Sequence, residues 1–544
     1  MTNTDPASTA SPGGSTARLI ADGRATLGIE LGSTRIKACL IDDSFETVAS
    51  GSFEWENENV DGVWTYGLDT AIEGLQAAYA DLVADVQKRY DTTPTSFAAI
   101  GISAMMHGYL ATDAAGELLV PFRTWRNSST GVAAAELTEA LDFNIPLRWS
   151  IAHLVQAAID REEHVPRVAS VTTLGGWVHR ALTGRDVLGV GDASGVFPID
   201  PATRDYDERM LDIAQQHLAE HAPAPTLREV LPEVLEAGAD AGSLTPDGAK
   251  LLDPSGRLKP GIPFCPPEGD AGTGMVATNS VAQRTGNVSV GTSIFAMIVL
   301  AEPLKTVHQE LDVVTTPTGD AVAMVHCNNG ASEIGAWARV FSQFAAALPG
   351  AGEVDQDAVF QTLLDEALTA DADAGGLLSF NYLAGEPVTG VEEGRPLLLR
   401  TPTSRFTLGN LVRSEVDAAF ATLAIGMEAL ADEEVEVDRL LAHGGLFRTP
   451  GAAQQLLAAA LKTPISVQAT ASEGGAWGVA VLAAYLAAAS EKSLAEFLDD
   501  NVFAGAEAVT ETPDPTAVAG FESYLARFRA ALPLQGAAAA ATPA

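Results

Sequence analysis

Basic residues are scarce in this sequence of 544 residues. Its 32 Lys and Arg residues stand against 71 Asp and Glu residues, which gives a formal net charge of −39 at pH 7. Nucleic acids and anionic membrane surfaces are also negative, so sequence-independent binding to either is electrostatically unfavourable. The acidity is typical of a solvated, repulsive surface, and we expect the ligand to be a small molecule.

Cysteine is nearly absent, and long apolar runs are missing. Cys39, Cys265 and Cys327 lie far apart and form neither a Cys-x-x-Cys pair nor a cluster with metal-ligand spacing. They are typical of buried small hydrophobes in a reducing compartment. No apolar stretch is long enough to span a bilayer, and residues 2–16 contain no apolar signal core. The sequence therefore predicts a cytoplasmic protein with no membrane or nucleic-acid partner.

The length and the hydrophobic fraction of 47% indicate two compact domains. The two ends of the chain lack side chains that could offset the entropy of ordering them. We therefore predict disordered tails at 1–25 and 536–544, an N-terminal lobe at 26–283 and a C-terminal lobe at 284–535.

Two segments of the sequence resemble each other. Residues 28–41 and 287–299 both place β-forming residues on either side of a Gly that two hydroxyl residues follow. This is the pattern of a β-hairpin whose turn needs a permissive backbone and exposes its amides. Because each half of the chain begins with the same hairpin pattern, we predict a duplicated domain.

Between and after these hairpins, apolar runs of strand and helix period alternate, which predicts an α/β fold with mixed sheets. The expected helices are 69–90, 132–141, 333–347, 414–431, 451–461 and 474–489, and the further expected strands are 97–103, 440–442 and 465–467.

The two hairpin turns are candidate phosphate sites. Gly32-Ser33-Thr34 and Gly291-Thr292-Ser293 can each direct N–H groups and hydroxyls at a phosphate. One such turn alone is more often structural, but a pair in matching strand contexts favours phosphate binding. A cleft between the two halves could then hold a polyphosphate from both sides.

Two carboxylates are candidates for the chemistry. Glu30 shares a strand face with the first turn and could reach Mg²⁺ directly or through water, or it could be an ordinary strand-face residue. Asp270 lies in a Gly- and Pro-rich stretch that we expect to be an irregular loop. There it could accept the proton of an attacking hydroxyl, or it could be a turn-forming Asp.

Candidate substrate contacts follow the strand predicted at 97–103. Met106 and His107 come just past its carboxyl end, where ligands bind in open α/β sheets, although a lone His is more often structural. Trp125 offers an apolar plate and Asn127 a polar group for hydroxyls; packing is the alternative. Gly444 and Gly445 form a strand-to-helix turn that would let a flat purine approach the backbone.

Taken in this order, the segments resemble the FGGY carbohydrate kinases of the xylulokinase and ribulokinase type, over roughly residues 26–535. Segment 28–37, which includes Lys37, is similar to the first phosphate motif of that family, and 106–108 to the substrate motif of its xylulokinases. Trp125 to Asn127 resembles their Trp-Asn-Asp, and Asp192 lies in a segment similar to their Asp-Ala-Ser-Gly. Asp270 falls on the catalytic base, the Gly291 turn on the second phosphate motif, and Gly444-Gly445 on the adenosine motif.

The resemblance implies two ribonuclease H-like lobes of the actin and hexokinase type with a cleft between them. It implies ATP and Mg²⁺ as co-substrates, a sugar bound deep between the lobes, and lobe closure before transfer. The chain departs from the family pattern at Glu30, where most members have Asp, and at Arg126 and Asn127. The sequence does not decide whether the protein forms a homodimer.

The hypothesis is transfer of the ATP γ-phosphate to the terminal hydroxyl of a ketopentose, with Asp270 as base. The Met-His-Gly segment favours D-xylulose, and L-ribulose is the alternative. A rival of another class is a non-catalytic actin-like regulator that binds ATP and a sugar, although no basic helix-turn-helix segment accompanies the chain.

Overall fold

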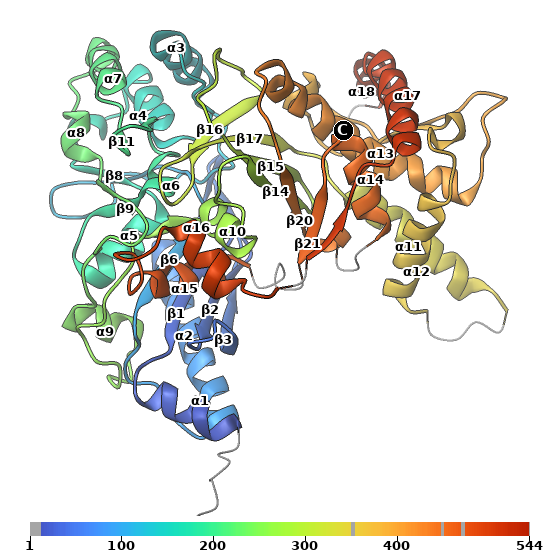
Figure 1. Ribbon diagram of the computed structural model, residues 1–544. Coiled ribbons are helices and arrows are strands. Elements are labelled where there is room, and N and C mark those ends of the chain that lie inside the picture. Colours follow the sequence, from blue (N-terminus) through green and yellow to red (C-terminus); the bar gives the residue numbers. More distant parts are fainter. Residues whose placement is uncertain (1–11, 350–353, 448–450, 469–473, 507, 543–544) are drawn as a thin grey trace, which may run out of the picture. The chain divides into compact units, whose positions relative to one another are not determined.

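The computed structural model describes residues 12–349, 354–447, 451–468, 474–506 and 508–542 (Figure 1). The chain divides into two compact units. Unit 1 comprises Met1–Val281, Val314–Asp320 and Glu473–Ala504, and unit 2 comprises Ala282–Val313, Ala321–Ser472 and Gly505–Ala544. In the described residues, no helix is long and apolar enough to cross a bilayer.

Unit 1 is built on a five-stranded sheet with the strand order β13-β6-β1-β2-β3. The first three strands of the chain pair antiparallel, whereas β6 runs parallel to β1 and β13 runs parallel to β6. The sheet thus joins a meander to two parallel strands. Its strands are β1 Thr26–Leu31, β2 Arg35–Ile41, β3 Thr47–Glu54, β6 Ile100–Ala104 and β13 Glu268–Gly269.

Helices from distant parts of the chain cover this sheet. Helix α2 (Leu68–Tyr90) packs on β3, and helix α15 (Gly474–Tyr485) packs on β1 and β6, so a red ribbon lies beside blue strands in Figure 1. The approach is close: a Cβ at Gly28 would lie 2.1 Å from the carbonyl oxygen of Ala476. Only glycine therefore fits at this point of β1.

Unit 1 contains further helices and short strands. Its helices are α1 Pro12–Ala21, α3 Gly131–Leu141, α4 Ser150–Ile159, α5 Leu174–Thr183, α6 Val190–Ala193, α7 Glu208–His221, α8 Leu227–Val230, α9 Pro246–Leu252, α10 Asp270–Ala277 and α16 Leu494–Phe497. Its short strands are β4 Glu58–Val60, β5 Val63–Thr65, β7 Leu110–Thr112, β8 Ser170–Thr172, β9 Val187–Gly189, β10 Ile199–Asp200, β11 Asp205–Tyr206 and β12 Glu233–Leu235.

Unit 2 repeats the same strand arrangement in a seven-stranded sheet of order β16-β17-β15-β14-β20-β21-β22. Here β14, β15 and β17 form the antiparallel meander, and β20 and β21 continue parallel to β14. Its strands are β14 Thr285–Val290, β15 Ile294–Val299, β16 Leu311–Thr315, β17 Ala321–Cys327, β20 Arg439–His443, β21 Ile465–Gln468 and β22 Ala508–Glu511. Both cores thus have the ribonuclease H-like order 3-2-1-4-5, which confirms the predicted duplication.

Unit 2 also contains a small hairpin and six helices. The hairpin consists of β18 Leu378–Phe380 and β19 Leu397–Leu399, and the helices are α11 Ser332–Ala347, α12 Gln356–Leu368, α13 Leu408–Asp432, α14 Ala452–Leu461, α17 Pro515–Ala531 and α18 Leu534–Ala541.

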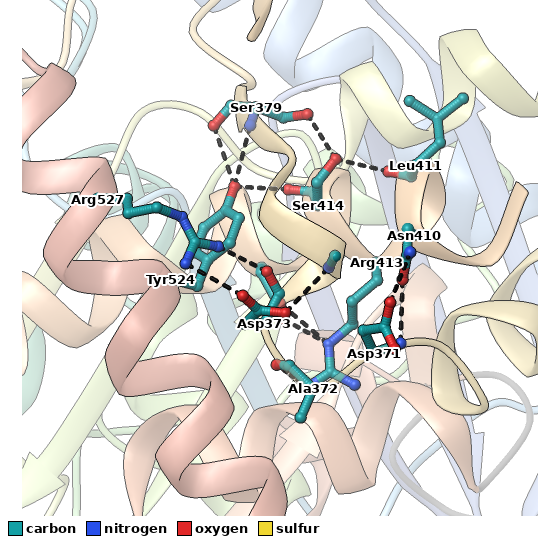
Figure 2. A network of polar contacts seen from close by, with 12 residues as sticks. Asp371, Ala372, Asp373, Ser379, Asn410, Leu411, Arg413, Ser414, Tyr524 and Arg527 are labelled. Atoms are coloured by element: carbon teal, nitrogen blue, oxygen red, sulfur yellow. Dashed lines mark hydrogen bonds and ion pairs between the residues drawn. The ribbon is translucent and has the colours of Figure 1, made fainter. Parts of the chain in front are cut away.

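A buried polar network joins α13 and α17 to the β18–β19 hairpin (Figure 2). The Tyr524 hydroxyl accepts a hydrogen bond from the N–H of Ser379 at 3.2 Å and donates to the carbonyl of Ser414 at 2.8 Å. Nearby, the buried Arg413 donates to Asp417 at 3.0 Å, so polar groups on α13 find partners without water.

The structure corrects the predicted ends of the chain. Helix α1 lies within the stretch predicted as the tail 1–25, and it is ordered because Leu19 and Ile20 are buried in the core of unit 1. Helix α18 likewise occupies most of 536–544, next to the buried side chain of Gln535. The predicted lobe 284–535 also differs from unit 2, because Glu473–Ala504 packs with unit 1.

Candidate active site

Asp270 is the first residue of helix α10 and directly follows strand β13, so the expected irregular loop is a strand-to-helix junction. Its side chain is open to solvent. Oδ1 accepts a hydrogen bond of 3.1 Å from the backbone N–H of Met106. The protein around Asp270 displaces part of the water near its carboxyl group, and this desolvation raises its pKa. The N–H groups of Met106 and Ala271 and the charge of Arg148 lower it. The result is an accessible carboxylate with a fixed orientation.

Met106 and His107 lie where β6 has ended, in a segment with an unusual backbone. His107 has φ of 70° and Gly108 has φ of 104°, so two successive residues occupy the left-handed region. His107 is buried, its Nδ1 lies 3.4 Å from the carbonyl oxygen of Gly195, and its ring stacks on Trp149. Tertiary contacts therefore hold this segment beside Asp270 in a conformation that few side chains adopt.

Asp192 is buried near Asp270 instead of lying open to a ligand. One oxygen accepts a hydrogen bond of 2.6 Å from the Thr173 hydroxyl, and the other has no hydrogen-bond partner among the described residues. Burial raises its pKa, the Thr173 hydroxyl lowers it and the charge of Asp270 raises it, which together place it at about 7. Asp192 therefore changes its protonation state near neutral pH.

A second buried acid, Glu268, was not singled out by sequence reasoning. It lies in β13 two residues before Asp270 and accepts hydrogen bonds from the N–H groups of Gly191 and Asp192. Burial, and then the charge of Asp192, raise its pKa to about 8. Its position in a Pro- and Gly-rich stretch carried no signal of burial, because the groups around it come from α6.

Two aromatic side chains fix the first predicted phosphate turn. Nε1 of Trp55 donates to the carbonyl of Gly32 at 2.7 Å, and the Tyr66 hydroxyl donates to the carbonyl of Ser33 at 2.7 Å. The two rings stack, with centroids 4.3 Å apart. These two hydrogen bonds hold the carbonyls of the turn, and the residues Ser33 and Thr34 are exposed to solvent.

A pocket of about 790 Å³ opens beside this turn. Ser33 and Thr34 line it on one side, and Trp125 and Arg126 line it on another. Trp125 is 40% exposed, and the Arg126 guanidinium lies 4.0 Å from the ring centre of Trp64. The lining combines hydroxyls and ring faces with charges of both signs, since Arg126 is joined there by Glu54 and Glu56, and it suits a polar ligand.

Asn127 does not face this pocket as a free polar group. Its Oδ1 accepts from the N–H of Trp64 at 2.9 Å, and its Nδ2 donates to the carbonyls of Trp64 and Thr124 at 2.8 and 3.0 Å. The side chain is buried. These bonds join the segment 124–127 to the β4–β5 hairpin, so the Asn127 amide pairs with backbone groups and holds the two segments together.

Glu30 lies in β1 opposite Lys37, whose Nζ is 3.9 Å from Oε2. The carboxylate also accepts the N–H of Ala476 at the start of α15, and a Cβ at Gly475 would lie 2.4 Å from Oε1. Burial raises the pKa of Glu30, Lys37 lowers it, and the charge of Asp270 raises it. The charge of Asp270 therefore disfavours the ionised form of Glu30.

Unit 2 holds the second predicted turn and the glycine pair together. The turn Gly291-Thr292-Ser293 joins β14 to β15, and its first two carbonyls accept the N–H groups of Ala331 and Gly330 at 2.8 and 2.7 Å. Gly444 has φ of 105°, and a Cβ there would lie 2.3 Å from the carbonyl oxygen of Val290. Gly445, which follows, borders open space. The predicted residues of the second half therefore meet at the carboxyl ends of β14 and β20.

Helix α15 lies where the sequence predicts a helix at 474–489. Its described residues are nearly all buried against β1, β6 and α10, which supports packing. Residues 448–450 and 469–473 lie outside the described part of the chain.

Comparison with known proteins identifies the family. The N-terminal domain model of the FGGY family of carbohydrate kinases matches residues 25–277, and its C-terminal domain model matches residues 286–487. The xylulose kinase of Klebsiella pneumoniae is 23% identical over 446 residues, which cover 77% of this chain and 81% of that protein.

Solved structures agree on the fold. The ligand-bound xylulose kinase of Lactobacillus acidophilus superimposes with a TM-score of 0.74 at 19% identity, over 95% of this chain and 99% of that one. A gluconate kinase of the same organism gives a TM-score of 0.74 at 19% identity, over 93% and 96%. Since two consecutive domain models of one family span both units, the chain belongs to the FGGY family of carbohydrate kinases and is a phosphotransferase.

Proposed function

We propose that this protein transfers the γ-phosphate of ATP to the terminal hydroxyl of D-xylulose. The observation that carries the proposal is the 3.1 Å hydrogen bond from the N–H of Met106 to Oδ1 of Asp270. It joins the Met-His-Gly segment to the proposed base, so one structural unit would both orient the sugar and receive its proton.

Asp270 is proposed as the general base. It accepts the proton of the sugar hydroxyl while that oxygen forms its bond to the γ-phosphorus, and the bond from that phosphorus to the bridging oxygen breaks to release ADP. Phosphoryl transfer depends mostly on positioning and charge stabilisation, so the fixed orientation of this carboxylate matters as much as its basicity. A raised pKa improves Asp270 as a proton acceptor, provided that it stays ionised at the working pH.

The sugar kinases of this family use ATP, and the phosphate contacts proposed here are the exposed turns at Gly32 and Gly291. Lys37 adds a positive charge beside the first turn, and Gly444 with Gly445 would admit the adenosine. Glu30 is the residue that we propose for Mg²⁺, and a cation there would relieve its repulsion from Asp270. Mg²⁺ keeps several waters and would screen charge on the phosphates, so Glu30, which already accepts the N–H of Ala476, would hold it through water.

The choice of sugar rests on two observations of unequal weight. The curated relatives are xylulose kinases at modest identity, and the Met106-His107-Gly108 segment lies beside the proposed base. The fold itself does not select the sugar, since a gluconate kinase superimposes as well as a xylulose kinase does.

The experiment is a coupled ADP-release assay on D-xylulose, L-ribulose, D-ribulose, L-xylulose, glycerol and gluconate, with the Asp270→Asn protein as the blank. We expect the highest kcat/KM on D-xylulose. A higher value on L-ribulose would replace the sugar and leave the reaction intact. Measurable ATP binding without turnover on any of the six would contradict the proposed substrate class.

A further inference from the structure

Three potential metal ligands meet on the outer part of unit 1, away from the residues proposed for catalysis. His217 and His221 lie four residues apart near the end of α7, so both side chains lie on one face of the helix. Glu136 comes from α3, which packs against α7. Two helices distant in sequence thus contribute an imidazole pair and a carboxylate to one point.

The spacing of the three ligand atoms matches that of a small coordination sphere. Nε2 of His217 lies 3.0 Å from Oε2 of Glu136, and Nε2 of His221 lies 3.8 Å from the same oxygen. All three ligand atoms lie within 4.8 Å of one another. Tetrahedral ligands about 2.0 to 2.2 Å from a zinc ion are roughly 3.3 Å apart, so only small side-chain shifts separate this arrangement from a bound state.

An ordinary hydrogen bond explains only one of the two histidines. His217 bonds to Glu136, whereas Nε2 of His221 is buried and has no hydrogen-bond partner among the described residues. A buried polar nitrogen without a partner is unfavourable. A cation would use the lone pairs of both imidazoles and of the carboxylate at once.

The surroundings allow an ion to enter. The side chains of His217, His221 and Glu136 are 19%, 29% and 42% exposed, so water can reach the cluster and complete the coordination. The net charge of −39 raises the concentration of cations near the surface in general. Specific binding must therefore come from the imidazoles, which favour zinc, copper, nickel and iron over magnesium.

We propose that Glu136, His217 and His221 bind one divalent transition-metal ion of the zinc class. The ion would cross-link α3 to α7. Helix α4, which packs against both, begins directly after Trp149, the residue whose ring stacks on His107. The site would therefore stabilise the helical layer behind the Met106-His107 segment, with no part in the transfer step.

The test uses full-length protein without an affinity tag, freed of metal with a chelator and then dialysed. Titration with Co²⁺ is followed by its visible absorption, and Tm is measured with Zn²⁺ or with Mg²⁺. We expect one Co²⁺ per chain and a rise in Tm of roughly 3 °C or more with Zn²⁺ only. Glu136→Gln should weaken Co²⁺ binding at least tenfold, and the double variant His217→Ala/His221→Ala should abolish it.

The control is Gln216→Ala, which removes an exposed side chain next to His217 and should bind Co²⁺ as the wild type does. If the double variant does not fold, His221→Asn removes one imidazole and keeps a polar side chain. Absence of a 1:1 Co²⁺ complex in the wild type would overturn the proposal. An equal rise in Tm with Zn²⁺ in the histidine variants would also overturn it, because Zn²⁺ would then bind to the acidic surface and not to the two imidazoles.

Discussion

The backbone N–H of Met106 and Oδ1 of Asp270 are joined by a hydrogen bond of 3.1 Å, although 164 positions separate the two residues in the chain. Met106 follows β6, Asp270 follows β13, and these two strands pair in parallel. The carboxyl ends of parallel strands meet at one sheet edge, which is where ligands bind in open α/β sheets. This single bond therefore brings the predicted substrate segment and the predicted base into one site.

Replacing Asp270 by Asn should lower kcat by roughly 100- to 10,000-fold, the usual contribution of a general base. The amide keeps the size of the side chain and can still accept the N–H of Met106, so the fold should persist. Kinetics and calorimetric ATP binding measure the two effects separately. Asp247→Asn, on the exposed face of α9, is the matched control. Turnover of Asp270→Asn within tenfold of the wild type would remove the role of base.

Trp125 and Asn127 should respond differently to truncation. Trp125→Ala removes an exposed ring from the pocket and should raise KM for the sugar roughly tenfold, which corresponds to about 1.4 kcal/mol, with little change in Tm. Asn127→Ala removes two hydrogen bonds to the backbone of Trp64 and one to the carbonyl of Thr124, and should lower Tm. An unchanged Tm in Asn127→Ala would contradict the structural role.

Glu268 makes stability depend on pH in a defined direction. Its pKa is raised from 4.5 to about 8 in the folded protein, so the folded state binds more protons than the unfolded state between these values. The stability that Glu268 contributes is therefore present below pH 4.5 and is lost as the pH rises to about 8, by up to about 1.4 kcal/mol per pH unit. Asp192, with a pKa of about 7, adds to this loss.

Glu268→Gln should remove most of that dependence, because the amide mimics the protonated acid. We expect Tm of the wild type to fall more steeply than Tm of the variant between pH 5 and 8, in scanning calorimetry at constant ionic strength. Glu73→Gln, on an exposed part of α2, is the control and should parallel the wild type. Parallel curves for Glu268→Gln as well would show that Glu268 keeps its charge when folded.

Gly28→Ala should destabilise unit 1, because the new methyl group would lie 2.1 Å from the carbonyl oxygen of Ala476. Relief of this overlap requires α15 to move from β1, at a cost of about 1 to 3 kcal/mol. Gly131→Ala, where nothing lies within 4 Å of the new carbon, is the control. Thermal unfolding of both variants gives the comparison, and equal Tm values would contradict the close packing.

The hairpins and long helices could be predicted from the sequence because their signals are local. The turn at Gly32, the turn at Gly291 and the helix predicted at 69–90 all lie where expected, the last as α2. Asp270 is predicted as the base for the same reason, from its place in a short motif. Its surroundings differ from the prediction, because a two-residue strand has too few side chains to show a period.

What the sequence could not provide depends on contacts between distant segments. The burial of Asp192 and Glu268 follows from the packing of α6 on β13, and the bonds of Asn127 follow from a hairpin at 58–65 that no strong pattern marks. The assignment of α15 to unit 1 depends on the glycines that let it approach β1 and β6. None of these has a periodic signal in one stretch of chain.

The return of Glu473–Ala504 to unit 1 has a consequence for synthesis on the ribosome. One face of β1 and β6 is covered by α15, which the chain supplies only after nearly all of unit 2 has been made. At about 5 to 20 residues per second, roughly 200 residues of further translation take about 10 to 40 seconds. During that time the nascent N-terminal half exposes an apolar sheet face, so its final folding step waits for the completion of the other half.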